Sequence, residues 1–339
     1  MPSQPRTRTP FWRDARKLEI VAQAIFVLAL VAALWGTSVA LERSFTRQNI
    51  RLDWGFFRQP AGFQLTALTW TIDLESLSLK RYDPGDSYAE AMIAGLFNTI
   101  KVAVLGIALA TILGLFVGIG RLSRNWLVNR LALAYVEFLR NTPLLVQLFF
   151  WYFAIFLQLP DGSPQEPPLR LFGSLIVLTN SGLAIGGMVV ERFGRLVVDG
   201  GLQLTTEFAA LVVGLAAYTS SFIAEIIRGG ILAVSRGQME AARSLGLRYG
   251  QALRFIVLPQ ALRIVIPPLG NQFLSLTKNS SLALGIGYAE FLTAANTVSS
   301  QSFRSLEAFT YVTLGYLVLS LTISAVLNLI RSRMGLAAT

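Results

Sequence analysis

The stretch that decides the fold is SRGQMEAARSLGLRYGQALRFIVLP, residues 235–259. It is a basic, Gly-punctuated segment between two apolar runs, so we expect a short helix held at a membrane surface. Ser235 and Gln238 have the spacing of a capping box, in which the hydroxyl and the amide each satisfy a free backbone N–H. Gly246 supplies a left-handed helix stop. Because a helix this short is marginal alone in water, it is a candidate docking element.

The composition indicates a membrane protein. Of the 339 residues, 53% are apolar and 14% are charged, whereas a soluble domain has about 25% charged residues. The chain has neither Cys nor His, which removes disulfides, thiol nucleophiles, imidazole bases and the usual transition-metal ligands. The net charge of +10 is scattered between apolar runs, which the positive-inside rule explains better than nucleic-acid binding does.

Apolar runs predict about six membrane spans, each long enough to cross a hydrocarbon core of about 30 Å. Arginine-rich loops mark the cytoplasmic side, which places both termini inside. A signal peptide is an alternative for the first run, since Ser38-Val39-Ala40 has the small residues of a cleavage site, but that run exceeds the usual apolar core of about 7–15 residues. The expected spans are 18–41, 91–120, 131–157, 208–227, 267–287 and 306–330.

The remaining segments are assigned by charge and by the parity of the crossings. An apolar run at 171–190 is long enough to suggest another span, but Asn180, Ser181 and several glycines weaken a helix there. An extra crossing would also place the arginines of 235–259 outside. We therefore expect cytoplasmic tails at 1–17 and 331–339, an external loop or small cap at 42–90, and an external insertion at 160–207 that packs on or dips into the bundle.

Two spans are expected to break inside the membrane. Arg140-Asn141-Thr142-Pro143 interrupts the third span, because the residue before a proline is pushed out of the helical region. Lys278-Asn279-Ser280-Ser281 interrupts the fifth span, which is expected to begin at Pro267-Pro268. Broken helices expose backbone donors and carbonyls, with which transporters build substrate sites. For Arg140 and Lys278 both a substrate-cavity role and a structural role stay open.

Three further charged residues lie within the expected spans, Lys101, Glu137 and Glu225. Each costs at least about 2.5–3.5 kcal/mol at mid-bilayer without a partner or a wet cavity, so snorkelling or internal pairing is the favoured interpretation. Gly114 and Gly118 have GxxxG spacing, which indicates close helix packing within the bundle. The sequence has no phosphate-binding loop, nucleophile elbow or metal set. Energy for uphill transport must therefore come from another subunit or an ion gradient.

The pattern of Glu240-Ala241-Ala242, Gly246, Ile256 and Leu258-Pro259 resembles the EAA loop of bacterial ABC importer permeases. Flanking motifs narrow the resemblance to the polar amino-acid permeases of the histidine, glutamine and arginine type. These motifs are RNTPLL at 140–145, AAYTSSFIAEIIRGGI at 216–231, LPQALRIVIPPLGNQF at 258–273 and KNSSL at 278–282. The extra first span, the loop 42–90 and the insertion 160–207 resemble the larger subunits of general, or neutral and acidic, L-amino-acid importers.

The resemblance implies an all-α polytopic protein with the type I ABC importer permease fold, a permease core at 91–330 and a cytoplasmic coupling helix at 236–245. It implies a transport subunit of the bacterial inner membrane that is not an enzyme and holds no cofactor itself. The implied partners are a second permease subunit, often non-identical, a periplasmic amino-acid-binding protein, and two ATPases that bind ATP and Mg.

The resemblance also supplies the expected site residues. Many relatives carry Asp-Thr at the position of Asn279-Ser280, and the family varies in which paired subunit holds the substrate. The residues expected to couple to the ATPase are Gly237, Glu240, Ala241, Ala242, Arg243, Gly246 and Pro259. Those expected along the substrate pathway are Arg140, Asn141, Thr142, Tyr218, Glu225, Gln272, Lys278, Asn279, Ser280 and Ser281.

Two other classes of function compete with the membrane subunit of an ATP-driven amino-acid importer. An ion-coupled secondary carrier acting without an ATPase would be favoured by an inverted internal repeat, and the sequence shows none. An intramembrane transferase would need a convergent catalytic set, which the lack of His and Cys argues against. A cationic cavity suits the carboxylate of every amino acid, so it does not distinguish acidic from neutral substrates.

Overall fold

The structure is a computed structural model that describes residues 15–47, 52–65, 69–163, 165–192 and 195–333. The chain divides into two compact units, Met1–Asp53 and Trp54–Thr339. In the first unit, α1 (Ala15–Arg47) is one helix with exposed apolar side chains, Phe26 being 68% exposed. Such an all-apolar surface is typical of a lipid-facing span. Most of the tail expected at 1–17 and of the tail expected at 331–339 lies outside the described residues.

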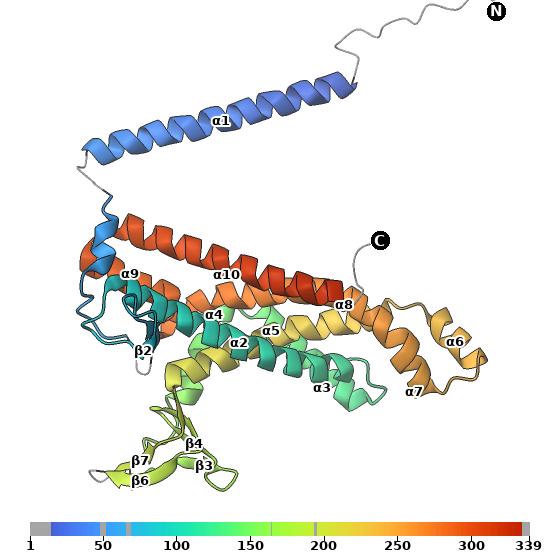
Figure 1. Cartoon of the computed structure of the whole chain (residues 1–339). Helices are drawn as coiled ribbons and strands as arrows, with labels where there is room; N and C mark the ends of the chain where they lie inside the picture. The colour runs from blue at the N-terminus through green and yellow to red at the C-terminus, as the bar shows by residue number, and fades with distance from the viewer. Residues whose placement is uncertain (1–14, 48–51, 66–68, 164, 193–194, 334–339) are drawn as a thin grey trace, which may run out of the picture. The chain divides into compact units, whose positions relative to one another are not determined.

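Two long helices form the centre of the second unit, α2 (Tyr88–Gly120) and α5 (Thr206–Leu232) (Figure 1). Their axes approach closely because two glycines of α2 face α5. A Cβ added at Gly114 would lie 2.6 Å from Cγ2 of Ile223, and one at Gly118 would lie 2.9 Å from the carbonyl oxygen of Ala224. The GxxxG spacing therefore serves packing within the bundle, as predicted.

The third apolar segment is divided into three pieces, α3 (Trp126–Asn141), α4 (Leu144–Phe149) and the π-helix η3 (Phe150–Phe156). Thr142 is extended, with φ −105° and ψ 135°, so the break predicted before Pro143 is confirmed. Because of this break, the segment is absent from the five helices in the described residues that are long and apolar enough to cross a membrane.

The fifth apolar segment runs without a gap through α7 (Tyr249–Ala252), the π-helix η4 (Leu253–Val257), α8 (Leu258–Asn279) and the 3₁₀-helix η5 (Ser280–Ile286). The helix begins well before Pro267-Pro268, where the fifth span was expected to start, and both prolines lie inside α8. A proline removes one backbone hydrogen bond and disfavours the helix, but a long membrane helix packed on its neighbours absorbs that loss. The change from α-helix to 3₁₀-helix falls at Ser280, where an interruption was expected.

The remaining helices are α6 (Arg236–Ser244), α9 (Phe291–Ser302) and α10 (Ser305–Arg333). Strand β2 (Leu79–Arg81), α9 and the start of α2 lie at one end of the bundle, and α6 and α7 lie at the other (Figure 1). One apolar core joins α2, α4, α5 and α8. A second core joins α9 and α10 to the 3₁₀-helix η2 (Trp54–Arg58).

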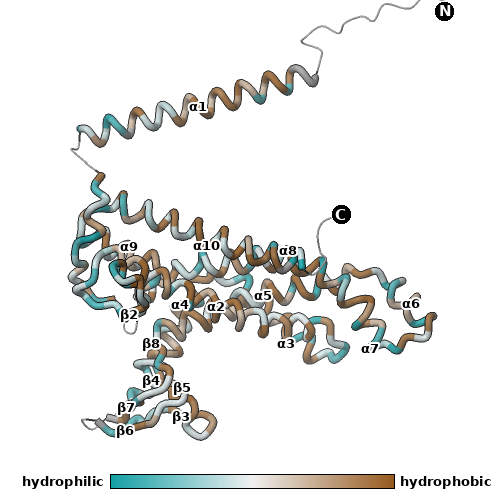
Figure 2. Tube along the Cα trace, viewed as in Figure 1, coloured by the Kyte–Doolittle hydropathy of each residue, from teal (hydrophilic) through white to brown (hydrophobic). Residues whose placement is uncertain are grey.

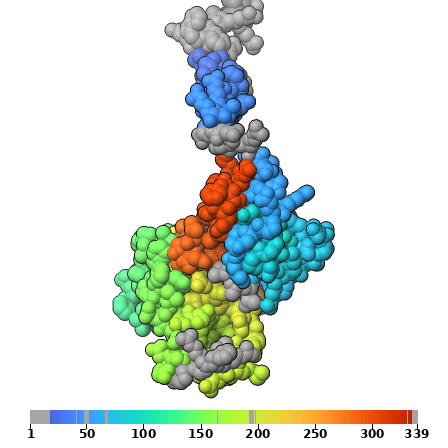
Figure 3. All heavy atoms as spheres, turned by 90° about the vertical axis from the view of Figure 1, so that its left-hand side faces the viewer, coloured from blue at the N-terminus to red at the C-terminus, as the bar shows by residue number. Residues whose placement is uncertain are grey.

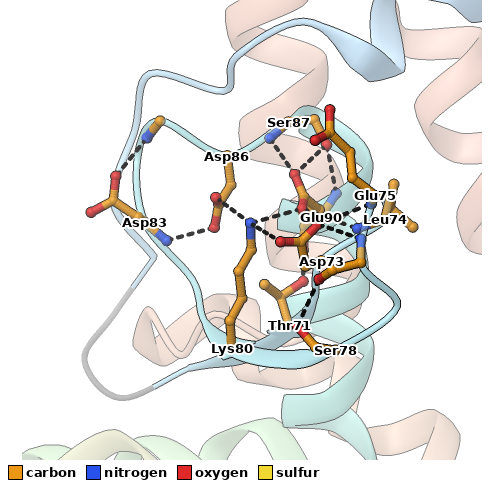
Figure 4. Close-up of polar contacts among 12 residues, drawn as sticks. Thr71, Asp73, Leu74, Glu75, Ser78, Lys80, Asp83, Asp86, Ser87 and Glu90 are labelled. Carbon is orange, nitrogen blue, oxygen red and sulfur yellow. Dashed lines mark hydrogen bonds and ion pairs between the residues drawn. The ribbon is translucent and has the colours of Figure 1, made fainter.

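An ion-pair cluster ties the segment before α2 to that helix (Figure 4). Lys80 Nζ lies 2.8 Å from Asp86 Oδ1, 3.0 Å from Glu90 Oε1 and 3.7 Å from Asp73 Oδ2. Ser87 and Glu90 form a capping box at the start of α2. The strands here, β1 (Trp70–Ile72) and β2, have three residues each, which is too short to give a sequence period. Residues 54–65 and 69–87 thus form a small cap, one of the two alternatives expected for this segment.

The insertion expected at 160–207 is built of strands. A four-stranded antiparallel sheet has the order β3-β4-β5-β8, and β6 pairs with β7 in a separate hairpin. Asn180 and Ser181, which weaken a helix, form the two-residue connection between β4 and β5. The apolar run 171–190 is therefore made of strands and turns. The bounds are β3 Leu169–Leu171, β4 Ile176–Thr179, β5 Gly182–Ile185, β6 Met188–Arg192, β7 Arg195–Asp199 and β8 Leu202–Thr205.

Candidate functional site

Helix α6 lies at the far end of the bundle, beyond α8 (Figure 2). Ala242 is its one buried residue, whereas Leu245, directly after it, is 84% exposed. Gly246 has φ +86°, and its amide donates to the carbonyl of Arg243 at 3.0 Å. The left-handed stop predicted at Gly246 is confirmed.

The predicted capping box at the start of α6 is wrong. The Ser235 side chain makes no cap hydrogen bond. Gln238 instead accepts a hydrogen bond from the side chain of Gln260 in α8, at 3.4 Å. The Gln238 amide, which a capping box would use, is thus hydrogen-bonded to a residue of another helix. This hydrogen bond links α6 to α8.

The residues expected to couple to an ATPase lie on and around α6. Ala242 packs inward, and Pro259 occupies the first turn of α8. Tyr249, at the start of α7, is 63% exposed. Exposed apolar and charged groups on one short helix suit docking to another protein. The members that face solvent are Gly237, Glu240, Ala241, Arg243, Gly246 and Pro259.

Glu225 is internally paired, which is the interpretation that the sequence favoured for it. Its Oε1 lies 3.0 Å from Arg121 Nε, at the end of α2, and its Oε2 lies 2.9 Å from Arg228, one turn further along α5. The Glu225 side chain is 20% exposed. The pair fixes α2 to α5 shortly before α6 begins.

Gln147 supports the break between α3 and α4, and sequence analysis missed it. Its Nε2 donates to the carbonyl oxygens of Leu139, at 2.7 Å, and Thr142, at 3.1 Å. Both carbonyls lie at the end of α3, where no following turn supplies N–H donors. The Gln147 side chain is 4% exposed, and its Oε1 has no hydrogen-bond partner. The sequence did offer a signal for this role of Gln147, because it is a polar residue within the apolar run that follows Pro143.

Arg140 lies over an aromatic pair of α5. Its guanidinium carbon is 5.1 Å from the ring centroid of Phe222, and that ring is 5.0 Å from the ring of Tyr218. A cation–π contact of this kind holds an arginine beside a membrane helix without a carboxylate partner. Two of the expected pathway residues, Arg140 and Tyr218, are therefore connected through Phe222. Asn141, exposed beside them, donates to Glu137 at 3.1 Å.

At the second break, the side chains of Ser280 and Ser281 bond back to the helix. They donate to the carbonyls of Thr277 and Lys278 at 2.7 and 2.8 Å. Ser280 is buried, Asn279 and Gln272 are partly buried, and Lys278 is exposed. Such back-bonding satisfies the hydroxyls within the bundle. Lys278 is thus the charged residue of this segment, and its side chain is exposed.

The helices that follow the two predicted breaks, α4 and η5, pack on each other. A Cβ added at Gly285 in η5 would lie 3.0 Å from Phe149 and 3.2 Å from Leu145, both in α4. Helix α4 lies within the bundle, whereas α6 is at its end (Figure 1). The residues expected for coupling on α6 therefore lie apart from α4 and η5.

A bundle of long apolar helices, with one apolar segment divided before Pro143 and a short exposed helix at one end, is typical of a membrane transport subunit. Residues 89–336 match the family described as the binding-protein-dependent transport system inner membrane component. The chain belongs to this family, whose members are multi-pass proteins of the inner membrane and are not enzymes.

Curated relatives agree with this class. The chain is 33% identical to the general L-amino acid transport system permease protein AapQ of Rhizobium johnstonii, covering 95% of this chain and 94% of AapQ. It is 34% identical to the putative amino-acid ABC transporter permease protein YhdX of Escherichia coli, covering 91% and 93%. The probable glutamine ABC transporter permease protein GlnM of Bacillus subtilis is 38% identical, covering 71% and 91%.

Solved structures give the same fold. An amino acid ABC transporter crystallised with histidines superposes with a TM-score of 0.53 at 32% identity, over 73% of this chain and 95% of that one. The MetNI methionine ABC transporter, at 16% identity and a TM-score of 0.50, supports the fold alone. This chain is a permease subunit of an ABC amino-acid importer with the type I importer fold. The comparisons give no support to the alternative of an ion-coupled carrier.

Proposed function

We propose that α6 receives the movement of a cytoplasmic ATPase and passes it to a substrate pathway at the two broken helices. The chain works with a second permease subunit, two ATP-binding subunits that hold ATP and Mg, and a periplasmic amino-acid-binding protein. Both termini then lie in the cytoplasm, on the same side as α6. The observation that carries this proposal is the exposure of α6, with Leu245 at 84%, at the end of a membrane bundle.

The contacts around α6 support a rigid connection into the bundle. Gln238 of α6 and Gln260 of α8 are hydrogen-bonded. A Cβ added at Gly230 in α5 would lie within 2.2 Å of Val265 in α8. Helices α5 and α8, which precede and follow α6 in the chain, are therefore in direct contact. A push on α6 would therefore move α5 and α8 together, because packed helices shift as units.

The cations at the breaks support a pathway for amino acids. Arg140 and Lys278 are exposed, and a carboxylate is the group that every amino acid offers to them. Asn141, Thr142, Asn279 and Ser281 add polar groups beside these cations. We place the substrate along α4 and η5, where the halves of the broken helices meet. Tyr218 and Gln272 line the same proposed pathway, and Glu225 serves as a brace through its ion pairs.

Affinity purification of the chain from bacterial membranes in mild detergent tests the partners. The account predicts stoichiometric recovery of an ATP-binding subunit and a second permease subunit, and loss of the ATP-binding subunit alone when Leu245 and Tyr249 are both replaced by Asp. Recovery of the chain without any ATP-binding subunit, under conditions where the permease remains folded, would contradict the proposal.

A further inference from the structure

The four-stranded sheet of the insertion has one face made entirely of leucine and isoleucine. Residues directly opposite each other in an antiparallel pair share a face, as do alternate residues of one strand. The row farthest from α5 is Leu171, Ile176, Ile185 and Leu202. The next row on the same face is Leu169, Leu178, Leu183 and Leu204. We refer to these eight residues as the leucine face.

The distal row of the leucine face is separate from the insertion's own core, to which Leu183 and Leu204 of the next row also contribute. That core lies on the opposite face, where Val177 is 1% exposed and Ala184 is 6% exposed. A cavity between the sheet and the β6–β7 hairpin is lined by Val177, Ala184, Leu196 and Val198. The hairpin therefore covers one face of the sheet. In water, an exposed apolar face on the other side would not stabilise a domain of this size.

Most of the distal row of the leucine face is exposed, whereas in the next row only Leu169, at 44%, is exposed. Leu204 packs against the apolar core that joins the membrane helices. In the distal row, Leu171 and Ile185 are exposed to 39% and 36%, and Leu202 to 58%. The face thus continues the apolar surface of the bundle outward from α5.

The turns beyond the distal row present still larger apolar groups. Phe172 is 81% exposed, Leu175 is 54% exposed and Met188 is 76% exposed, and all three line one surface hollow. Phe172 has φ +53°, a left-handed conformation that is a genuine outlier for a bulky residue. A strained backbone that holds a phenylalanine out of the fold indicates a function for the side chain.

The insertion is joined directly to membrane helix α5. β8 ends at Thr205 and α5 begins at Thr206, so no linker separates the sheet from the membrane helix. β3 and the turn after it lie toward the α6 end of the bundle, whereas β6 and β7 lie toward the opposite end (Figures 1 and 2). In the view along the bundle, the yellow-green atoms of the insertion lie together on one side of the bundle (Figure 3).

We propose that the leucine face, with the turns at Phe172 and Met188, rests on the acyl chains of the outer leaflet of the bilayer. The surface has no charged residue at its eight positions and is continuous with membrane helix α5, which favours lipid over a polar protein partner. Arg170 lies on the opposite face of edge strand β3 and is exposed, where it reaches headgroup phosphates. The sheet lies at the boundary between acyl chains and headgroups, since the free N–H and C=O groups of its edge strands need water or headgroups as partners.

Spin labels on single cysteines test the proposal, because the chain has no cysteine of its own. Leu175→Cys and Met188→Cys are labelled in the full chain, reconstituted with its partner subunits in vesicles of phosphatidylethanolamine and phosphatidylglycerol. Glu191→Cys, exposed on β6, is the matched control. Collision rates with oxygen and with a water-soluble nickel chelate report lipid and water around each label.

The proposal predicts a several-fold higher oxygen-to-nickel collision ratio at Leu175 and Met188 than at Glu191. A ratio equal to that of Glu191 would overturn it, because the turns would then be in water. Protection of both labels from oxygen as well as nickel would also overturn it, since a protein would then cover the face. Lipid spin-depth markers that place both labels below the headgroups would agree with the first result.

Discussion

The contact between α2 and α5 gives the sharpest prediction for the bundle. A Cβ at Gly114 would lie 2.6 Å from Cγ2 and 2.7 Å from Cβ of Ile223, and 3.0 Å from the carbonyl oxygen of Ser220. Cβ and backbone atoms cannot move by a change of rotamer, so Gly114→Ala forces the helices apart. Overpacking of this kind costs about 1–3 kcal/mol.

Gly229→Ala is the matched control, since a Cβ at Gly229 in α5 would meet nothing within 4 Å. Both variants gain the same helix preference of alanine over glycine, about 0.5–1 kcal/mol. The difference between their free energies of unfolding therefore isolates the overpacking cost of about 1–3 kcal/mol. Unfolding in mixed micelles, followed by tryptophan fluorescence, measures both. Equal unfolding free energies would refute the close helix contact.

Three further predictions concern the site and the cap. Gln147→Leu removes both hydrogen bonds to the end of α3, so we expect a loss of about 1–3 kcal/mol in unfolding free energy and slower transport; unchanged stability would mean that the break does not need Gln147. Lys278→Met should weaken substrate binding to the assembled transporter while Lys101→Met does not, and equal affinities would remove Lys278 from the pathway. The hydrogen bond from Lys80 to Asp86 raises the pKa of Lys80 above its usual 10.5, and amide hydrogen bonds from Glu75 and Ser76 lower the pKa of Asp73 below 3.8. The stabilisation by Lys80 is thus complete below pH 10.5 and lost only as pH rises through its raised pKa, and that by Asp73 is lost as pH falls below 3.8. Hydrogen exchange of residues 70–90 should be protected evenly from about pH 5 to pH 9, and a loss of protection near neutral pH would exclude these ion pairs as the cause.

The sequence predicted the parts of the fold that depend on local chemistry. Pro143 forces Thr142 out of the helix, and Gly246 adopts the left-handed conformation that few other residues accept. These outcomes depend on a residue's own backbone, so a pattern in the sequence is enough to anticipate them.

The predictions failed where tertiary contacts decided the outcome. Ser235 does not cap α6, and the side chain of Gln238 bonds instead to Gln260, 22 positions away. Pro267 lies within a helix that its neighbours support. The insertion was missed as a sheet because strands of three to five residues give too few repeats of a two-residue period. Gln147 was overlooked because its two acceptors become available only when the helix breaks.

The most direct test of the account is ATP-driven uptake by the assembled transporter in vesicles carrying Glu240→Arg in this chain. Glu240 is exposed on α6, so we expect normal membrane insertion and partner assembly, with ATP hydrolysis no longer coupled to amino-acid uptake. Glu191→Arg, the same charge reversal on the insertion, should transport as the unchanged protein does. Uptake by Glu240→Arg at the unchanged rate would contradict the coupling role of α6, and accumulation driven by an ion gradient in the chain alone would contradict the account as a whole.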